Sequence, residues 1–490
     1  MIDFLLLALI AVACLAFASK FERDKIWLML PTGFVAIVVL RVISVVITAP
    51  VVRAIPQLKT ADFWLFVAAL LAICISSFAW LKTQWKLAAV AVASAAAIMF
   101  GSRVIGLSTL THGDSIWILT MSEYISRGGD PAYLGTQMSL KRGFSLILMI
   151  GLGKDLPRLD EVLPIVFVLV ALITVGLAWY LLKNYSSRIR LISISAVTLL
   201  VFTAWLPWVT VFYVNGHTLV ALGIMVSVSS MLIDKKSFKN PTSRVVTFCL
   251  GLALVTLTRP EGIVLSLILV ALFAGYGALS ARSVLFSVGS VFAAFLAWMG
   301  TVNAYIVSWN RIGLVSVAML VGLAILALGL YRVPKFVHKV FWLTPWILAG
   351  LFAVMAVVFA EQLARGEAAL AINLLFFEGK WGFIIWAMLL VVAISLFVLR
   401  EAAYSLMLRV LVSMGVASLL SKMLDGGITG QPTLGRVGWV DSLNRMWIHI
   451  LGILVVILVL GVAQLLTNKF VGFHLRSKPL EDSHNAAEQE

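Results

Sequence analysis

The chain has 490 residues, of which 62% are hydrophobic and only 12% are charged. Soluble domains contain roughly 45–50% apolar residues, so this composition excludes an ordinary soluble protein. The formal net charge of +15 does not indicate nucleic-acid binding. The Lys and Arg residues form short clusters between apolar segments, and no basic helix or arm could follow a phosphate backbone. Long apolar runs without alternation predict an all-α polytopic membrane protein.

Apolar segments of spanning or near-spanning length recur along the whole chain. Because about 20 apolar residues cross a bilayer as a helix, we expect about 13–15 transmembrane helices. The predicted cores are 3–18, 27–49, 62–81, 87–107, 162–182, 191–209, 218–233, 245–258, 263–280, 284–308, 314–331, 341–360, 382–399, 403–420 and 446–466.

The connections between these segments lie alternately on the two sides of the membrane, and the two sides differ in their number of Lys and Arg residues. One set of connections holds more than half of the Lys and Arg residues, for example Lys20/Arg23/Lys25 and Arg332/Lys335/Lys339. The positive-inside rule assigns that side to the cytoplasm, together with the tail 467–490, which we expect to be disordered. The compact loops suggest the plasma membrane of a bacterium.

The opposite, extracytoplasmic side receives the longest polar segments. We therefore divide the chain into N-terminal transmembrane helices (1–107), an extracytoplasmic loop (108–161) and a transmembrane bundle (162–466) with further external loops at 361–381 and 421–445. The mixture of aromatic, apolar and charged residues in 108–161 and 361–381 predicts amphipathic helices lying in the interface. Such helices suit a substrate that is part lipid and part polar.

The first external loop opens with the most informative carboxylate of the chain, Asp114. One interpretation makes Asp114 the N-cap of a surface helix, with its carboxylate at the positive end of the helix dipole. The other makes it a general base at a water-filled cavity. The neighbouring His112 could be a second acid or base, or a solvated loop residue.

Further along this loop, Gly128-Gly129 followed by Asp130-Pro131 predicts the end of the helix. The basic residues of this loop have two interpretations: they pair with its acidic residues, or they bind a phosphate. The basic residues are Arg127, Lys141, Arg142, Lys154 and Arg158, and the acidic ones are Glu123, Asp130, Asp155, Asp160 and Glu161. Among the basic residues of this loop, Lys141-Arg142 is the better phosphate candidate, because the next residue is a glycine that allows close approach.

Two other external stretches contain charged residues directly beside apolar segments. Thr258-Arg259-Pro260-Glu261-Gly262 is either an Arg–Glu pair at a turn or a functional site, since ionisable residues in membranes are often functional. Before the last helix, Asp441, Arg445 and His449 follow at i, i+4 spacing, with Asn444 beside Arg445. This is either a solvated helix start or a grip on a lipid phosphate.

Several of these residues resemble the shared pattern of membrane-embedded GT-C-type glycosyltransferases. That pattern is an acid at the start of the first large external loop, an aromatic about three residues later, and Gly and Pro-Tyr after the following helix. Asp114, Trp117, Gly128/Gly129 and Pro131-Ala-Tyr133 match it in order. About four segments precede the loop here, which is a departure, and Ser115 stands where many members have a second acid. Glu123, Asp130 and Glu261 are then the candidates for that second acid.

The resemblance implies an extracytoplasmic transferase that uses a polyprenyl-phosphate-linked sugar and a glycan, lipid or protein acceptor, with inversion, in building the cell envelope. Asp114 would be the base. The leading candidates for binding the departing phosphate are Arg445 and Arg259, followed by Lys141 and Arg142. Possible supporting residues are His112, Glu123, Asp130, Glu261, Asp441 and Asn444. No Walker A, zinc-protease or serine-hydrolase motif occurs, and no cofactor or resident metal is expected, although a divalent metal stays open. The rivals are a transporter or flippase of an amphipathic substrate and a non-catalytic assembly subunit.

Overall fold

Helices form nearly all of the regular structure in the computed structural model of the chain. The structure describes residues 2–20, 25–58, 60–104, 113–127, 129–130, 148, 162–212, 216–259, 261–302, 309–358, 369–398, 406–429 and 445–467. Within these ranges every one of the fifteen predicted apolar cores coincides with a helix. The prediction of an all-α polytopic membrane protein is confirmed.

The chain divides into two compact units. The first comprises residues 1–177, 205–266 and 289–321, and the second comprises 178–204, 267–288 and 322–490. Helices that belong wholly to the first unit are α1 (Ile2–Ala18), α2 (Ile26–Ala54), α3 (Ala61–Ser76), α4 (Phe78–Thr83), α5 (Trp85–Val104), α6 (Gly113–Ser126), α11 (Trp205–Phe212), α12 (His217–Leu232) and α13 (Pro241–Thr258).

Helices that belong wholly to the second unit are α10 (Ser187–Phe202), α17 (Pro334–Trp342), α18 (Thr344–Val358), α20 (Ile384–Val398), α22 (Leu406–Thr429) and α24 (Leu451–Thr467), the last preceded by the 3-10 turn Trp447–Ile450. Residues of both units occur in α9 (Val162–Leu181), α14 (Gly262–Gly275), α15 (Ala281–Val302) and α16 (Trp309–Arg332).

Six helices in the described part are long and apolar enough to cross a membrane: Ile26–Ala54, Leu163–Leu181, Pro241–Thr258, Ala281–Thr301, Gly313–Arg332 and Trp447–Thr467. The bent pair α17 and α18 would add a seventh, and several shorter apolar helices accompany them. The chain is therefore an integral membrane protein, and the larger count of about 13–15 spans stays a prediction that depends on the shorter helices.

Some predicted segments are interrupted where the sequence carries a local breaker. The segment 62–81 divides at Ser77, whose hydroxyl donates to the Ala16 carbonyl on α1 over 3.2 Å instead of remaining on its own helix. The segment 191–209 divides at Thr203–Ala204, before Pro207. Proline lacks an N–H and its ring clashes with the carbonyl four residues earlier, so one continuous helix is disfavoured there. By contrast, α22 continues to Thr429, into the segment predicted as an external loop.

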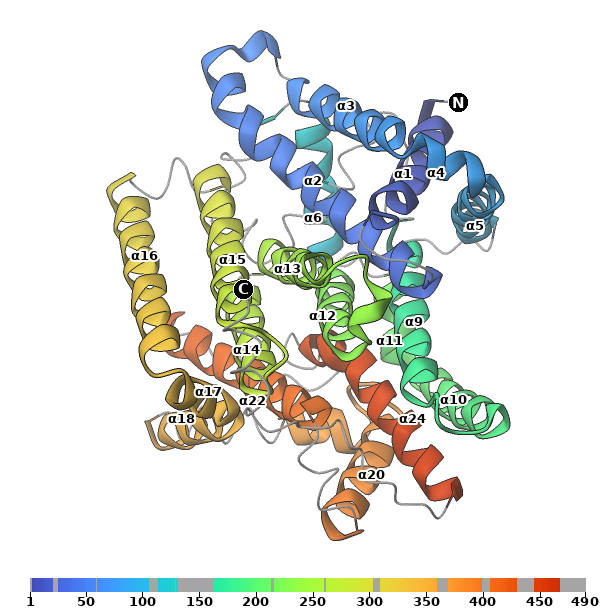
Figure 1. Cartoon of the computed structure of the whole chain (residues 1–490), viewed down its shortest axis with the longest axis vertical. Coiled ribbons are helices and arrows are strands. Elements are labelled where there is room, and N and C mark those ends of the chain that lie inside the picture. Colours follow the sequence, from blue (N-terminus) through green and yellow to red (C-terminus); the bar gives the residue numbers. More distant parts are fainter. Residues whose placement is uncertain are drawn as a thin grey trace. The chain divides into compact units, whose positions relative to one another are not determined.

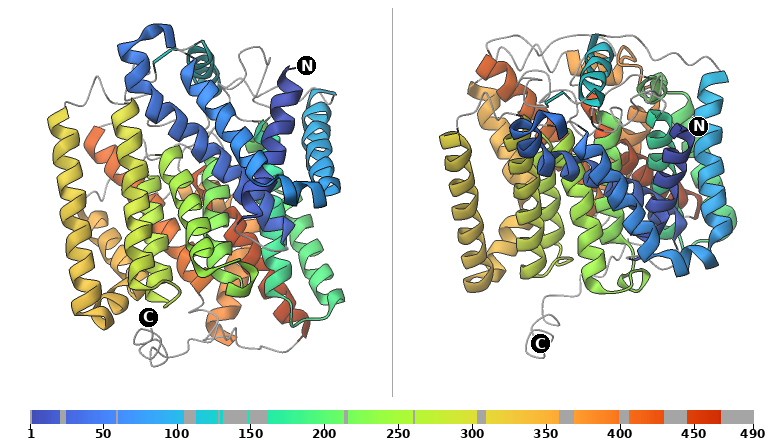
Figure 2. Two further views of the ribbon diagram at one scale, coloured as in Figure 1. Left: turned by 45° about the horizontal axis from the view of Figure 1, so that its top comes forward. Right: turned by 90° about the horizontal axis from the view of Figure 1, so that it is seen from above.

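The core of the first unit is the antiparallel pair α12 and α13, which lie side by side (Figure 1, Figure 2). Every residue of α12 is buried. A Cβ at Gly251 would lie 2.4 Å from the Gly223 carbonyl oxygen, so the two backbones approach as closely as they do only because both positions lack side chains. The Ser227 hydroxyl then donates to the Phe248 carbonyl over 3.0 Å and links the two helices.

Candidate functional site

The helix α6 carries Asp114 in its first turn. It begins at Gly113, so Asp114 lies one position inside the helix and not before it, within the margin of such boundaries. The side chains of residues 113–115 lie outside the described part, but a carboxylate in the first turn is still favoured by the positive end of the helix dipole.

Beyond its first turn, α6 has one buried and one exposed side, and the exposed side includes the apolar Ile116. Ile118, Met121 and Ile125 are buried, whereas Trp117 and Tyr124 are exposed. Trp and Tyr are enriched where membrane meets water, because their rings are part apolar and part polar. The residue pattern therefore fits a helix that packs on the protein with one side and faces the interface with the other.

The predicted end of this helix is confirmed. The last helical residue is Ser126, and the Gly129 N–H donates to the Tyr124 carbonyl over 2.9 Å. A Cβ at Gly129 would lie 2.4 Å from the Tyr124 ring, so only glycine allows the chain to turn across it. The predicted pairing of Arg127 with Glu123 is also present, between side chains that are 72% and 60% exposed.

Directly after this turn, Asp130 is held by an arginine that lies far away in the sequence. Arg53 on α2 donates from Nε to Oδ2 of Asp130 over 2.7 Å and from Nη2 to Oδ1 over 3.0 Å. Nη2 also donates to the Thr301 carbonyl on α15 over 2.9 Å. The paired hydrogen bonds between Arg53 and Asp130 have a fixed geometry. Arg53 therefore links α2 to α15 and to the chain that follows α6. All three ends lie on the extracytoplasmic side in the predicted topology.

The pair Arg259–Glu261 confirms the turn interpretation of that stretch. Arg259 Nε donates to Glu261 Oε1 over 2.9 Å, both side chains are mostly buried, and the Gly262 N–H donates to the Arg259 carbonyl over 2.9 Å. The guanidinium that was a candidate for a donor phosphate thus already has a carboxylate partner.

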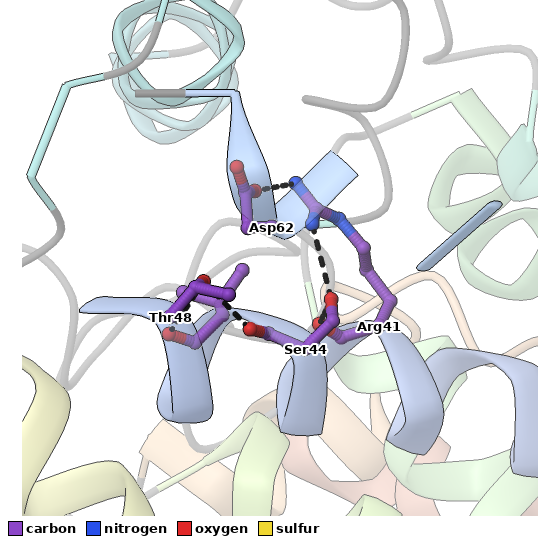
Figure 3. A network of polar contacts seen from close by, with 5 residues as sticks. Arg41, Ser44, Thr48 and Asp62 are labelled. Atoms are coloured by element: carbon purple, nitrogen blue, oxygen red, sulfur yellow. Dashed lines mark hydrogen bonds and ion pairs between the residues drawn. The ribbon is translucent and has the colours of Figure 1, made fainter. Parts of the chain in front are cut away.

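A second buried ion pair lies on α2, and neither member was singled out from the sequence. Arg41 is 2% exposed and its Nη2 lies 2.7 Å from Oδ2 of Asp62, which is 17% exposed, at the start of α3. Figure 3 shows the Arg41 side chain reaching from α2 to Asp62, with Ser44 beside it. Arg41 Nη1 donates to the Ser44 hydroxyl over 3.2 Å. The guanidinium also lies 5.9 Å from the Phe66 ring.

A sequence signal for this pair does exist. Arg41 is the only charged residue between Lys25 and Arg53, within a helix that is long and apolar enough to cross a membrane. An ionisable residue in such a helix marks a functional or paired site by default. Arg53 carries no such signal, because it stands at a helix end where charged residues are ordinary.

In the second unit, Arg445 and His449 are both buried, in contrast to the solvated helix start that was one interpretation. His449 lies in the 3-10 turn Trp447–Ile450 that leads into α24. Asp441 and Asn444, the other members of the predicted group, lie outside the described residues, as do His112, Lys141 and Arg142. Asp114, Asp130 and Arg259 belong to the first unit and Arg445 to the second.

Within the part of the chain that the structure describes, no group of three or more His, Cys, Asp or Glu side chains is placed to hold a metal ion. No protein-family model, no curated protein and no solved structure matches the chain.

Proposed function

We propose that the protein is a membrane glycosyltransferase that moves a sugar from a polyprenyl-phosphate-linked donor to an extracytoplasmic acceptor, with inversion. The observation that carries the proposal is the position of Asp114, in the first turn of a helix that is followed by Asp130, which Arg53 links to α2 and α15. A catalytic carboxylate must be held in place while its substrates enter and leave, and this anchoring supports such a role.

In the proposed reaction, the acceptor hydroxyl attacks the anomeric carbon from the face opposite the leaving group. A new carbon–oxygen bond forms to the acceptor, and the bond to the lipid phosphate breaks with its electron pair on the phosphate oxygen. Asp114 accepts the hydroxyl proton.

Negative charge develops on the departing lipid phosphate, and a cation near it would lower the barrier. Arg445 and Arg259 are the leading candidates from the sequence, and in the structure Arg259 forms an ion pair with Glu261. Lys141 and Arg142 remain candidates from the sequence alone. The activated donor supplies the chemical energy, so the proposal needs no nucleotide site.

The test is release of free polyprenyl phosphate, measured by mass spectrometry, from purified protein in nanodiscs given a panel of polyprenyl-phosphate sugars and acceptors. Asp114→Asn should abolish release. Glu378→Gln is the control, because it removes an exposed carboxylate that is not among the candidate site residues. Equal turnover by wild type and Asp114→Asn would show that Asp114 is not the base.

The second candidate function, a transporter or flippase of an amphipathic lipid-linked substrate, is favoured by the ion pair between Arg41, inside a candidate membrane span, and Asp62 at the start of α3. Buried charges in membrane helices often mark a substrate or ion pathway. Donor binding by wild type with no release of polyprenyl phosphate for any acceptor would favour this function over the transferase.

A further inference from the structure

The helix α17 departs from the direction of its neighbours at the end of a candidate membrane span. The span Gly313–Arg332 ends α16, a single residue follows, and α17 then runs for 9 residues. Its axis is bent by 58° from that of α18. At 1.5 Å per residue α17 is about 14 Å long, far shorter than the roughly 30 Å hydrocarbon core. It can lie along the membrane surface but cannot cross the membrane alone.

Three exposed cations lie along this part of the chain: Arg332 at the end of α16, and Lys335 and Lys339 on α17. The sequence contains no Asp or Glu between Glu261 and Glu361, so no carboxylate is near them along the chain. Among the described residues, no acidic side chain forms an ion pair with any of the three. Their charges therefore face outward together.

Two exposed aromatic side chains lie next to these cations in the sequence. Tyr331 is 61% exposed and Phe336 is 65% exposed. Tyr331 is at the end of α16 and Phe336 is on α17. Basic residues beside exposed aromatic rings at the end of a span are typical of the headgroup layer, where the rings enter the acyl boundary and the charged groups remain in the polar region.

The opposite side of α17 is fixed to the rest of the second unit. His338 Nδ1 lies 2.7 Å from the Ala274 carbonyl oxygen. At the end of the helix, Arg409 Nη1 donates to the Trp342 carbonyl over 2.9 Å, and its guanidinium carbon lies 3.7 Å from the centre of the Trp342 ring. A Cβ at Gly275 would lie 2.5 Å from the Trp342 backbone nitrogen, so α14 and α17 meet closely there. These contacts hold the outer side in one orientation.

We propose that Tyr331, Arg332, Lys335, Phe336 and Lys339, the α17 surface, form a binding site for anionic phospholipid headgroups. The site goes beyond the proposed catalysis and does not depend on it. No described carboxylate pairs with these cations, so their positive charge selects a negatively charged headgroup, and the exposed rings at the end of a span select a lipid over a soluble anion. The alternation of charge along the chain predicts that this surface faces the cytoplasm, where anionic lipids are concentrated.

The chain contains a matched control in the turn between α12 and α13. Lys235, Lys236 and Lys239 are likewise three exposed cations, but Asp234 stands beside them and Phe238 is buried. The Asp234 carboxylate accepts a hydrogen bond from the Lys236 N–H over 3.1 Å. This turn has the same number of cations without the exposed rings and with a carboxylate next to them.

The experiment uses the full chain in nanodiscs made from an equimolar mixture of phosphatidylcholine and phosphatidylglycerol, with the lipids retained on the released protein counted by native mass spectrometry. Wild type should retain phosphatidylglycerol in preference to phosphatidylcholine. The triple variant R332Q/K335Q/K339Q should lose that preference, by up to about fivefold for each charge removed. Phe336→Ala should weaken it to a smaller extent.

The control variant K235Q/K236Q/K239Q should retain the lipids of wild type. Equal losses in the two triple variants would overturn the proposal, because the preference would then follow total charge and not the α17 surface. The proposal would also be overturned if wild type retained phosphatidylglycerol and phosphatidylcholine equally, or if the R332Q/K335Q/K339Q variant kept the preference for phosphatidylglycerol. In the last case the surface would be better explained by a protein partner. All substituted side chains are exposed, and an unchanged elution profile in detergent checks that each variant is folded.

Discussion

The ion pairs Arg41–Asp62 and Glu123–Arg127 join the same kinds of groups in opposite surroundings. The first links two helices and its arginine is 2% exposed, whereas the second links successive turns of α6 between side chains that are 60% and 72% exposed. In water the attraction between charges is small and their solvation is good, so an exposed pair adds little stability. A buried arginine has lost its solvation, and its partner carboxylate becomes indispensable.

The pair Arg53–Asp130 lies between these extremes. Both side chains are partly buried, and Arg53 also donates to the Thr301 carbonyl. Its significance is positional, because it fixes the chain immediately after the helix that carries Asp114. The three pairs therefore form a series of decreasing burial, and substitutions should follow the same order.

The largest effect is expected for Asp62→Ala. The Arg41 guanidinium would remain buried with the Ser44 hydroxyl as its nearest remaining partner, and an uncompensated buried charge costs about 3–5 kcal/mol. The free energy of unfolding, measured by titration with sodium dodecyl sulfate in mixed micelles, should fall by that amount. A fall no larger than that of an exposed substitution would show that water reaches Arg41.

The substitution Asp130→Asn should have the next largest effect. It keeps the shape of the side chain but removes the charge that receives two hydrogen bonds from Arg53, and bonds to charged groups contribute about 1.5–3 kcal/mol. The same titration should show a loss of about 1–3 kcal/mol. In the assay for polyprenyl-phosphate release, turnover should also fall if α6 must be held in place. Unchanged stability and turnover together would contradict the anchoring role.

A double variant tests whether the cost of Asp62→Ala comes from the unpaired charge on Arg41. Replacing both charges, as in R41M/D62L, removes the buried charges along with their attraction, and such exchanges are often close to neutral. The unfolding free energy should return to within about 1 kcal/mol of wild type, although the single variant Asp62→Ala loses several. A double variant as unstable as the single one would mean that the pair has a structural role beyond neutralising Arg41.

The smallest effect is expected for Glu123→Gln. An exposed pair at i, i+4 spacing contributes about 0.5 kcal/mol or less, so the titration curve should nearly overlay that of wild type. Turnover should be unchanged as well, because Asp114 is intact. A marked loss of turnover at unchanged stability would instead make Glu123 the second acid that the resemblance to GT-C-type enzymes leaves open.

Much of the fold follows from local features of the sequence. Helix positions were predictable because each segment is long and apolar, and the end of α6 was predictable from Gly128-Gly129 and Pro131. The pairings of Arg127 with Glu123 and of Arg259 with Glu261 were also predictable, because the partners are close in sequence. The breaks at Ser77 and before Pro207 were not expected, since their polar or cyclic side chains stand inside segments whose average hydropathy is high.

The sequence by itself determined that this is an all-α membrane protein and where its helices lie, because hydrophobic length and helix-stopping residues act within a few turns of chain. Only the tertiary structure decided which charges meet. Arg41 finds Asp62 on the following helix, and Arg53 finds Asp130 and Thr301, which are 77 and 248 residues away. Such contacts depend on how whole helices pack, and no local pattern encodes the distance between two side chains on different helices.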